Sequence, residues 1–261
     1  MLAALEPLQA DAERRFGGLR RLYGDAAYER IRAARIAIVG LGGVGSWAAE
    51  ALARSGVAAL TLIDLDHVSE SNINRQIQAT TNTLGQAKVL ALRERIALIH
   101  PDCEVTAIEE FVDEANWPGL LPHAVDAVID ACDQMRAKVA IAAWAMATDT
   151  PLVVSGAAGG KRRPQAVEVE DLSLTTHDPL LASLRQRLRQ RHGAARTGPI
   201  GVRCVFSRES VVMPEAATDA ACEVDGSLNC HGYGSSVAVT STFGMASASE
   251  ALELVFRRLR A

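Results

Sequence analysis

A short polar stretch holds the residues of this chain whose types best suit chemistry on an anionic ligand. Two cations, Arg75 and Lys88, could flank a triphosphate and neutralise its charge. A nicotinamide dinucleotide carries only a diphosphate and needs no such pair. A solvated charged loop is the alternative for the same composition. The polar residues of this stretch, DLDHVSESNINRQ followed by GQAK, are Asp64, Asp66, Asn72, Asn74, Arg75, Gln76 and Lys88.

Two carboxylates lie at the end of a predicted buried strand further along the chain, in the sequence DACD. Asp130 closes the apolar segment AVDAVID, and Asp133 lies just beyond it. The carboxyl ends of parallel strands face the ligand crevice of an open sheet, where a carboxylate can hold Mg²⁺ against phosphate oxygens. We therefore predict Asp133 as a magnesium ligand and Asp130 as a second candidate. Capping of the next helix by Asp133 is the alternative, and the two roles are compatible.

Glycines form a turn between a predicted strand and a predicted helix, in the sequence GLGGVG. Such a turn lets a phosphate approach the backbone, and the N-terminus of the following helix supplies N–H donors. Asp64 ends the next strand, where a carboxylate accepts hydrogen bonds from ribose hydroxyls. The turn alone does not distinguish a redox dinucleotide from ATP, but Arg75, Lys88 and Asp133 favour ATP with magnesium. The glycines of the turn are Gly40, Gly42, Gly43 and Gly45.

Apolar periodicity predicts the elements that must position these groups. Strands and helices alternate up to residue 160, which favours a Rossmann-like α/β fold, a mostly parallel sheet flanked by helices. We expect a single domain over 1–261, with a nucleotide-binding core at 1–160 and a substrate-binding elaboration at 161–261 packed on the sheet. Asp178 is the expected N-cap of the helix over 178–192. The other predicted elements are strands over 35–39, 59–63, 103–108, 124–130, 151–155 and 165–172, helices over 44–54, 87–99 and 138–149, and loops over 193–236.

Composition narrows the class of protein. The 261 residues include 31 acids and 27 bases, so the net charge of −4 gives no global basicity that would indicate nucleic acid. The five cysteines form no CxxC pair and no secretion signal opens the chain, which predicts reduced thiols and a cytoplasmic protein. The segment 226–249 lacks Asp, Glu, Lys and Arg, yet it is too rich in Ser, Thr and Gly for a bilayer, and we expect a packed helix and no membrane association.

The polar stretch, the glycine turn and DACD together resemble the ubiquitin-activating-enzyme-like adenylating superfamily, which includes the ThiF and MoeB proteins. The pattern of glycine loop, D.D.V..SN..RQ, G..K and D..D occurs here in order, and the resemblance covers roughly residues 13 to 155. It implies that Asp64 binds ribose and that Asp133 holds magnesium. The residues that it places against the phosphates are Asn72, Arg75, Gln76 and Lys88.

A narrower resemblance runs nearly end to end, to the tRNA threonylcarbamoyladenosine dehydratase branch of that superfamily. It is carried by RRFGGLRRLYG, NRQIQA, SGAAGG, DPLLASLRQRL, VRCVFSRE and NCHGYGSSVAVTSTFG. It implies ATP-dependent cyclisation of the threonylcarbamoyl group on adenosine 37 of tRNA, a homodimer, a sulfur-acceptor partner of a cysteine desulfurase system and a bound monovalent cation. Many superfamily members have an arginine that acts across the dimer where this chain has Gly18, and Arg20 or Arg21 is the candidate substitute.

Basic residues after position 160 are candidates for contacts with an RNA backbone. A solvated arginine-rich helix is the alternative, and the resemblance favours RNA. Cys230 stands beside His231 in a small-residue loop and is a candidate reactive thiol, with a packing role as the alternative. The candidate tRNA-binding residues are Lys161, Arg162, Arg163, Arg185, Arg189, Arg191 and Arg196.

Three functions are compatible, to different degrees, with the predicted nucleotide-binding site. Adenylation of the threonyl carboxylate, followed by ring closure that releases AMP, needs no protein nucleophile because both reacting groups belong to one nucleoside. Adenylation of the C-terminus of a ubiquitin-like sulfur carrier uses the same site, but the zinc-binding CxxC pairs common in such enzymes are absent. A redox enzyme or a non-catalytic nucleotide-binding module would not need Arg75, Lys88 and Asp133.

Overall fold

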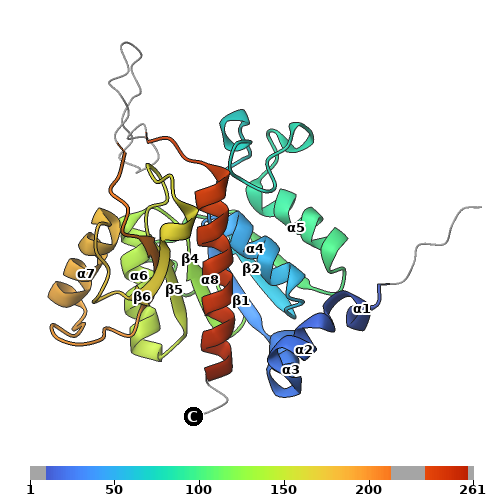
Figure 1. Ribbon diagram of the computed structural model, residues 1–261, viewed down its shortest axis with the longest axis horizontal. Coiled ribbons are helices and arrows are strands. Elements are labelled where there is room, and N and C mark those ends of the chain that lie inside the picture. The colour runs from blue at the N-terminus through green and yellow to red at the C-terminus, as the bar shows by residue number, and fades with distance from the viewer. Residues whose placement is uncertain (1–9, 213–232, 258–261) are drawn as a thin grey trace, which may run out of the picture.

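A seven-stranded sheet forms the centre of the protein, in a computed structural model that describes residues 10–212 and 233–257 (Figure 1). The strand order is β3-β2-β1-β4-β5-β7-β6, and all neighbours pair parallel except β6 and β7, which pair antiparallel. The strands are β1 (Arg35–Val39), β2 (Ala59–Ile63), β3 (Glu104–Ile108), β4 (Ala127–Asp130), β5 (Leu152–Ser155), β6 (Val167–Asp171) and β7 (Arg203–Ser207).

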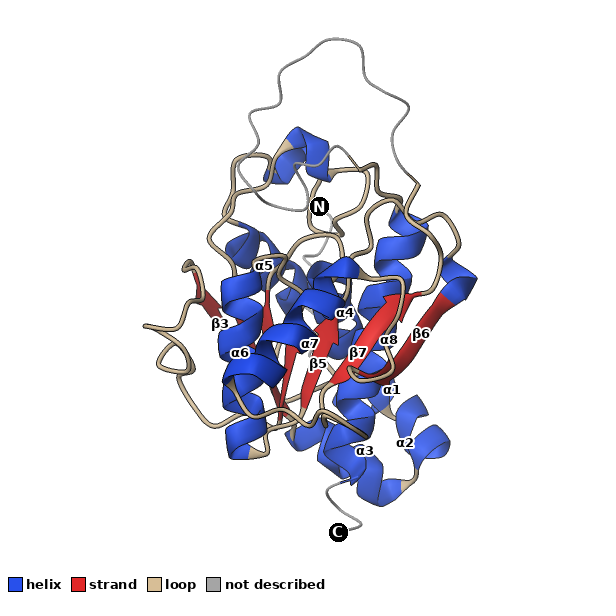
Figure 2. Ribbon diagram, turned by 90° about the vertical axis from the view of Figure 1, so that its left-hand side faces the viewer, coloured by secondary structure: helices blue, strands red, loops and turns tan. Residues whose placement is uncertain are grey.

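Helices cover both faces of the sheet, as the alternating sequence pattern predicts. Figure 2 shows α6 and α7 over one face, and α4 and α8 cross the other face in Figure 1. The helices are α1 (Ala12–Phe16), α2 (Gly18–Tyr23), α3 (Asp25–Ala33), α4 (Gly45–Arg54), α5 (Lys88–Ile99), α6 (Met135–Thr148), α7 (Pro179–Arg191) and α8 (Val237–Arg257), with short 3-10 turns at Glu70–Asn72, Thr81–Thr83 and Pro164–Ala166. The Rossmann-like α/β expectation is confirmed.

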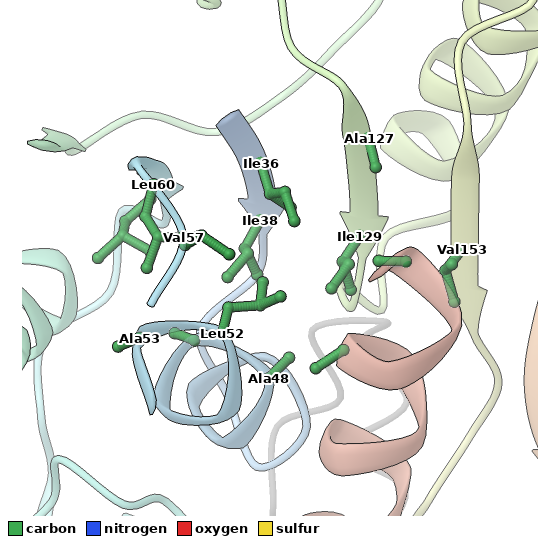
Figure 3. Close-up of a cluster of buried hydrophobic side chains, with 14 of the residues drawn as sticks. Ile36, Ile38, Ala48, Leu52, Ala53, Val57, Leu60, Ala127, Ile129 and Val153 are labelled. Carbon is green, nitrogen blue, oxygen red and sulfur yellow. The ribbon is translucent and has the colours of Figure 1, made fainter. Parts of the chain in front are cut away.

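Successive side chains of β1 point to opposite faces of the sheet, and the hydrophobic core therefore has two layers. Ile36 and Ile38 pack with Leu52 of α4 and Phe243 of α8 in one buried cluster, part of which is drawn in Figure 3. Ala37 and Val39 point to the opposite face, into the cluster formed with α6 and α7. A strand that is buried on both faces reads as a continuous apolar run, as RIAIV does. Two helical layers are therefore needed to cover this sheet.

The segment after residue 160 differs from expectation in one element. The sequence RCVFS lies within the segment 193–236 for which we expect loops, yet it forms β7 between β5 and β6 in the same sheet. A segment of five residues is too short for the alternation of a strand to be recognised from sequence. It becomes a strand because it pairs with β5 and β6. Asp178 does cap α7, since its side chain accepts a hydrogen bond from the Leu181 N–H.

The charge-poor C-terminal stretch contributes the long helix α8, which packs against α4 and the sheet. Val239, Phe243 and Ala251 are fully buried on it. Within residues 10–212 and 233–257, no helix has both the length and the apolar content to cross a bilayer. The expectation of a packed helix is confirmed for residues 237–249, whereas residues 226–232 lie outside the part of the chain that the structure describes.

Candidate functional site

A cleft of about 630 Å³ opens at the carboxyl ends of the strands. It lies where the chain order reverses, because β1 has β2 on one side and β4 on the other. Loops that follow adjacent strands on either side of such a point diverge and leave a crevice, which is where open α/β sheets bind ligands. The cleft is therefore the site that the fold itself provides.

The glycine turn forms one edge of this cleft, and three of its positions require glycine for different physical reasons. Gly40 has φ of 85°, and a Cβ on it would lie 2.7 Å from the backbone nitrogen of Cys132. A Cβ on Gly45 would lie 1.8 Å from the carbonyl oxygen of Gly40. By contrast, a Cβ on Gly42 would meet nothing within 4 Å, although Gly42 lines the cleft. Gly42 thus presents bare backbone to open space, as close approach of a phosphate requires.

Asp64 and Asp66 follow β2 and line the same cleft. Asp64 accepts hydrogen bonds from the backbone N–H of Leu41 at 2.5 Å and from that of Asp66 at 2.8 Å. Burial raises the pKa of Asp64, and Lys88 opposes that rise. The two backbone donors fix the carboxylate beside the glycine turn, where the sequence placed a ribose ligand.

The segment after Asp66 presents its polar groups to the cleft through a hydrogen-bonded turn. The carboxamide oxygen of Asn72 accepts from the Ser69 N–H at 3.1 Å. Arg75 donates from Nη1 to the Ser71 carbonyl at 2.7 Å and to Asn74 Oδ1 at 3.1 Å. Burial lowers the pKa of Arg75. Of the predicted phosphate contacts, Asn72, Arg75, Gln76 and Lys88 all line the cleft.

Lys88 is the first residue of α5, and only 5% of its surface is exposed. Its Nζ lies 2.6 Å from Asp66 Oδ2. A charge-assisted contact of this length orients the ammonium group at the cleft wall. The structure therefore brings Arg75 and Lys88 to one site, although each also has partners in the protein.

The two carboxylates of DACD occupy different environments. Asp133 lines the cleft, and burial raises its pKa. Asp130 is fully buried behind it, with Oδ2 3.2 Å from Lys138 Nζ and Oδ1 accepting from Cys132 Sγ at 2.9 Å. Lys138 also donates to the Ser155 carbonyl at 3.0 Å, so this pair joins the ends of β4 and β5.

Magnesium suits this donor set only together with a phosphate ligand. No group of three or more His, Cys, Asp or Glu side chains able to hold a metal occurs in the part of the chain that the structure describes. Mg²⁺ is commonly bound through one or two carboxylates, with water and substrate phosphates completing its shell. Asp133 beside the glycine turn fits that mode, whereas Asp130 is engaged by Lys138.

Several lining residues were not predicted as site residues. Behind the cleft, Trp47 of α4 donates to the Arg75 carbonyl at 2.9 Å and so supports the segment that contains Arg75. The loop 155–159 lines the cleft beyond β5, and its small-residue run SGAAGG was the sequence signal for it. Phe111 and Tyr233 also line the cleft. Phe111 comes from a segment without a clear pattern, whereas Tyr233 belongs to the motif NCHGYGSSVAVTSTFG, which indicated no role for the tyrosine itself.

The predicted basic RNA surface is only partly present as a surface. Lys161 is buried, and its Nζ donates to the carbonyls of Ser207, His177 and Glu209. Arg185 likewise donates to the Leu172 and Thr175 carbonyls, at 2.9 and 3.0 Å. Lys161 therefore does not belong to an exposed basic surface. Its buried ammonium group donates hydrogen bonds to protein carbonyls in place of the water that it would contact at the surface.

The other basic candidates differ in exposure. Arg189 is half-buried and donates to the Ala195 carbonyl at 2.9 Å. The exposed candidates are Arg162, Arg163, Arg191 and Arg196.

The candidate reactive thiol, Cys230, lies outside the residues that the structure describes.

The N-terminal arginines are also distinguished by their partners. Arg20 makes ion pairs with Glu13, Asp25 and Glu29 at 2.9, 2.7 and 3.0 Å. It also stacks over the Tyr28 ring, at 4.2 Å from the centroid. Arg21 is exposed. Of the two candidate substitutes for the arginine missing at Gly18, Arg20 is thus held by three carboxylates, whereas Arg21 is exposed.

The fold and the cleft define a Rossmann-like protein with a nucleotide site at its topological switch point. The model of the ThiF family matches residues 16–260, and the chain belongs to this family. It is 44% identical over 247 residues to tRNA threonylcarbamoyladenosine dehydratase of Escherichia coli (strain K12), covering 92% of each chain. It is 38% identical over 130 residues to molybdopterin-synthase adenylyltransferase of the same organism, covering 50% of this chain and 51% of that protein.

A solved structure gives the same relationship in three dimensions. The crystal structure of E. coli tRNA N6-threonylcarbamoyladenosine dehydratase in complex with ATP superposes with a TM-score of 0.86 at 41% identity. The match covers 97% of this chain and 99% of that one. The similarity to the dehydratase therefore includes the segment after residue 160, whereas the similarity to the adenylyltransferase spans only half of the chain.

Proposed function

We propose that this chain catalyses the ATP-dependent dehydration of threonylcarbamoyladenosine at position 37 of tRNA. The observation that carries this proposal is the nearly end-to-end similarity to a dehydratase of that name. The cleft supports it, because Arg75, Lys88 and Asp133 line the same hollow as the glycine turn. A site that only binds a dinucleotide has no use for this combination.

The first step activates a carboxylate that is a poor acyl donor. An oxygen of the threonyl carboxylate attacks the α-phosphorus of ATP, the bond to the β-phosphate breaks, and pyrophosphate leaves. Gly42 allows the phosphates to approach the backbone, and Arg75 and Lys88 stabilise the charge that develops on them. Magnesium, held by Asp133, would supply further neutralisation of the phosphate oxygens.

The second step closes a ring within the substrate. The carbamoyl group of the same threonine attacks the acyl-adenylate carbonyl, a five-membered ring forms, and AMP leaves with the oxygen that the carboxylate contributed. Both partners are attached to one nucleoside, so proximity favours closure and the protein needs only to hold the nucleoside beside the phosphates. The net change in the nucleoside is the loss of one water.

The proposal extends to a homodimer and a cytoplasmic location. Arg21 is exposed on α2, whereas Arg20 is held by the carboxylates of Glu13, Asp25 and Glu29. Arg21 is therefore our candidate for an arginine offered to the cleft of a second copy. A tRNA substrate and ATP are both available in the cytoplasm.

Mass spectrometry of the nucleoside tests the activity directly. We would incubate the protein with ATP, Mg²⁺ and tRNA that carries threonylcarbamoyladenosine, digest the tRNA, and measure the modified nucleoside. We expect loss of one water together with AMP and pyrophosphate, and neither product with tRNA that lacks the modification. An unchanged nucleoside, with AMP formed instead on a ubiquitin-like sulfur carrier, would replace this proposal with carrier adenylation.

A further inference from the structure

The charges that line the cleft are distributed unevenly along the order of the strands. Among the described residues, the charged lining side chains follow β2, β3 or β4 or begin α5, and none of them lies after Asp133 in the sequence. The lining residues that come from beyond β5 carry no formal charge. Ser235 and Thr240 also belong to this second set, and Thr240 lies beside Gly43 of the glycine turn. We call the rest of the set the uncharged wall and define it as residues 155–159, Pro179, Leu180, Val211 and Tyr233.

A triphosphate belongs on the charged side of this cleft. Its oxygens need counter-charges and N–H donors, which the glycine turn, Arg75 and Lys88 supply. The uncharged wall offers apolar and small side chains and one aromatic ring, and these surfaces suit a neutral planar group. A cleft with both halves can hold two substrates of different chemistry side by side.

The wall is held in place by Asp178, the residue that caps α7. Asp178 Oδ1 accepts from the Leu181 N–H at 3.0 Å, and Oδ2 accepts from the Ala157 N–H at 2.8 Å. A Cβ on Gly156 would lie 2.2 Å from Asp178 Oδ2, so only glycine allows this approach. One carboxylate thus joins the loop after β5 to the start of α7, and the surface between them is preorganised.

Tyr233 is positioned at the edge of this wall by a second glycine. The Gly160 N–H donates to the Gly234 carbonyl at 2.9 Å, and the Val212 N–H donates to the Gly160 carbonyl at 2.8 Å. The position of a Cβ on Gly160 would be 3.5 Å from Tyr233 Cδ1. The backbone next to the tyrosine is therefore fixed, and the ring is half-buried where it lines the cleft.

We propose that the uncharged wall is the subsite for the base of the modified nucleoside, and that Tyr233 stacks on this base. This inference rests on the proposed function and specifies how its substrate is held. Single-stranded RNA loops are read by stacking of exposed bases on aromatic side chains. A base placed here directs its threonylcarbamoyl group toward Arg75 and Lys88, where the α-phosphate is activated.

The test is a double-mutant cycle between Tyr233 and the base. The RNA probes are an anticodon stem-loop with threonylcarbamoyladenosine at position 37 and the same stem-loop with an abasic position 37. For the unchanged protein, we expect the abasic RNA to bind about 10- to 100-fold more weakly in fluorescence anisotropy. Tyr233→Leu should weaken binding of the modified RNA by a similar factor and bind the two RNAs nearly equally, whereas Tyr233→Phe should retain the preference.

Two controls separate the subsite from other roles of the tyrosine. Tyr23→Leu changes a tyrosine of α2 with 38% exposure that does not line the cleft, and both affinities should stay unchanged. The ATP affinity of Tyr233→Leu should also match that of the unchanged protein.

The inference and the proposed function fail in different ways. Additive losses in the cycle, or weakened ATP binding with normal RNA binding, would overturn the subsite even if the unchanged protein dehydrates tRNA. The second result would instead assign the wall to the adenine of ATP. If the unchanged protein does not alter the modified nucleoside at all, the proposed function is wrong, and the assignment of the subsite, which rests on it, is rejected too.

Discussion

Asp133 illustrates how position, more than residue type, separates two neighbouring carboxylates. It lines the cleft, whereas Asp130 is fully buried and lies 3.2 Å from Lys138. A buried ion pair whose cation also binds a carbonyl is a structural unit, and loss of one partner leaves an unpaired charge. We therefore assign the proposed magnesium contact to Asp133 alone.

Replacement of this carboxylate gives the prediction at the scale of one residue. Asp133→Asn keeps the size of the side chain but removes the charge, so we expect turnover to fall by a factor of about 100 or more while the protein still unfolds at its usual temperature. Release of pyrophosphate and thermal unfolding are the measurements. Asp102→Asn, at the opposite ends of the strands, is the matched control. Undiminished pyrophosphate release would remove Asp133 from the site.

At the scale of the element, the turn between β1 and α4 contains glycines with opposite roles. Gly45 is required by packing, since a Cβ there would lie 1.8 Å from the Gly40 carbonyl oxygen. Gly42 has open space beside it and lines the cleft. The same substitution at the two positions should therefore affect different properties of the protein.

We expect Gly45→Ala to lower the free energy of unfolding by about 1–3 kcal/mol, the usual cost of overpacking. Gly42→Ala should unfold like the unchanged protein but bind ATP at least about tenfold more weakly, because its methyl group occupies the space that a phosphate needs. Urea denaturation and calorimetric titration with ATP measure the two effects. Normal ATP affinity in Gly42→Ala would show that the phosphates do not pass this glycine.

At the scale of the whole molecule, His100 links the N-terminal helices α1 and α3 to the end of α5. It follows α5 and packs on the Phe16 ring of α1, with a centroid distance of 4.7 Å. Its Nε2 lies 3.0 Å from Arg32 Nη1, a contact in which the ring nitrogen must accept. Burial and the charge of Arg32 lower the pKa of His100. The native protein thus holds a neutral imidazole at this junction.

The stability of the protein should therefore depend on pH in a direction that the structure sets. In the unfolded chain, His100 takes up a proton near its ordinary pKa of about 6.5. The folded protein does not do so until the pH is lower, so the unfolded state binds more protons and the free energy of unfolding falls between about pH 7 and pH 5. His100→Gln should reduce this slope in urea denaturation series. An identical slope in the variant would show that other groups cause the dependence.

Much of the fold and of the nucleotide half of the site was predictable from the sequence because its features are local. The strand RIAIV, the glycine turn and the helix that follows are adjacent in the chain, so spacing alone predicts their geometry. Asn72, Arg75 and Gln76 lie within one short segment, and Lys88 begins the next long helix. The structure shows these residues lining one cleft, as their order suggested.

The remaining features depended on contacts between distant segments. The strand β7 exists because RCVFS pairs with β5 and β6. Lys161 looked like part of a basic surface, but it is surrounded by carbonyls from His177, Ser207 and Glu209. Nothing in the spacing of DACD indicated that Lys138 would engage Asp130.

By itself, then, the sequence determined the α/β class and the glycine turn of the nucleotide site, because hydrophobic period and glycine spacing act over a few residues. It also predicted Arg75 and Lys88 as contacts for a triphosphate. Only the tertiary structure decided which charged groups face the cleft and which are buried in ion pairs. It also formed the uncharged wall, whose residues come from four separate segments of the chain. Burial and pairing are properties of the assembled chain, since each requires a partner that the local sequence does not specify.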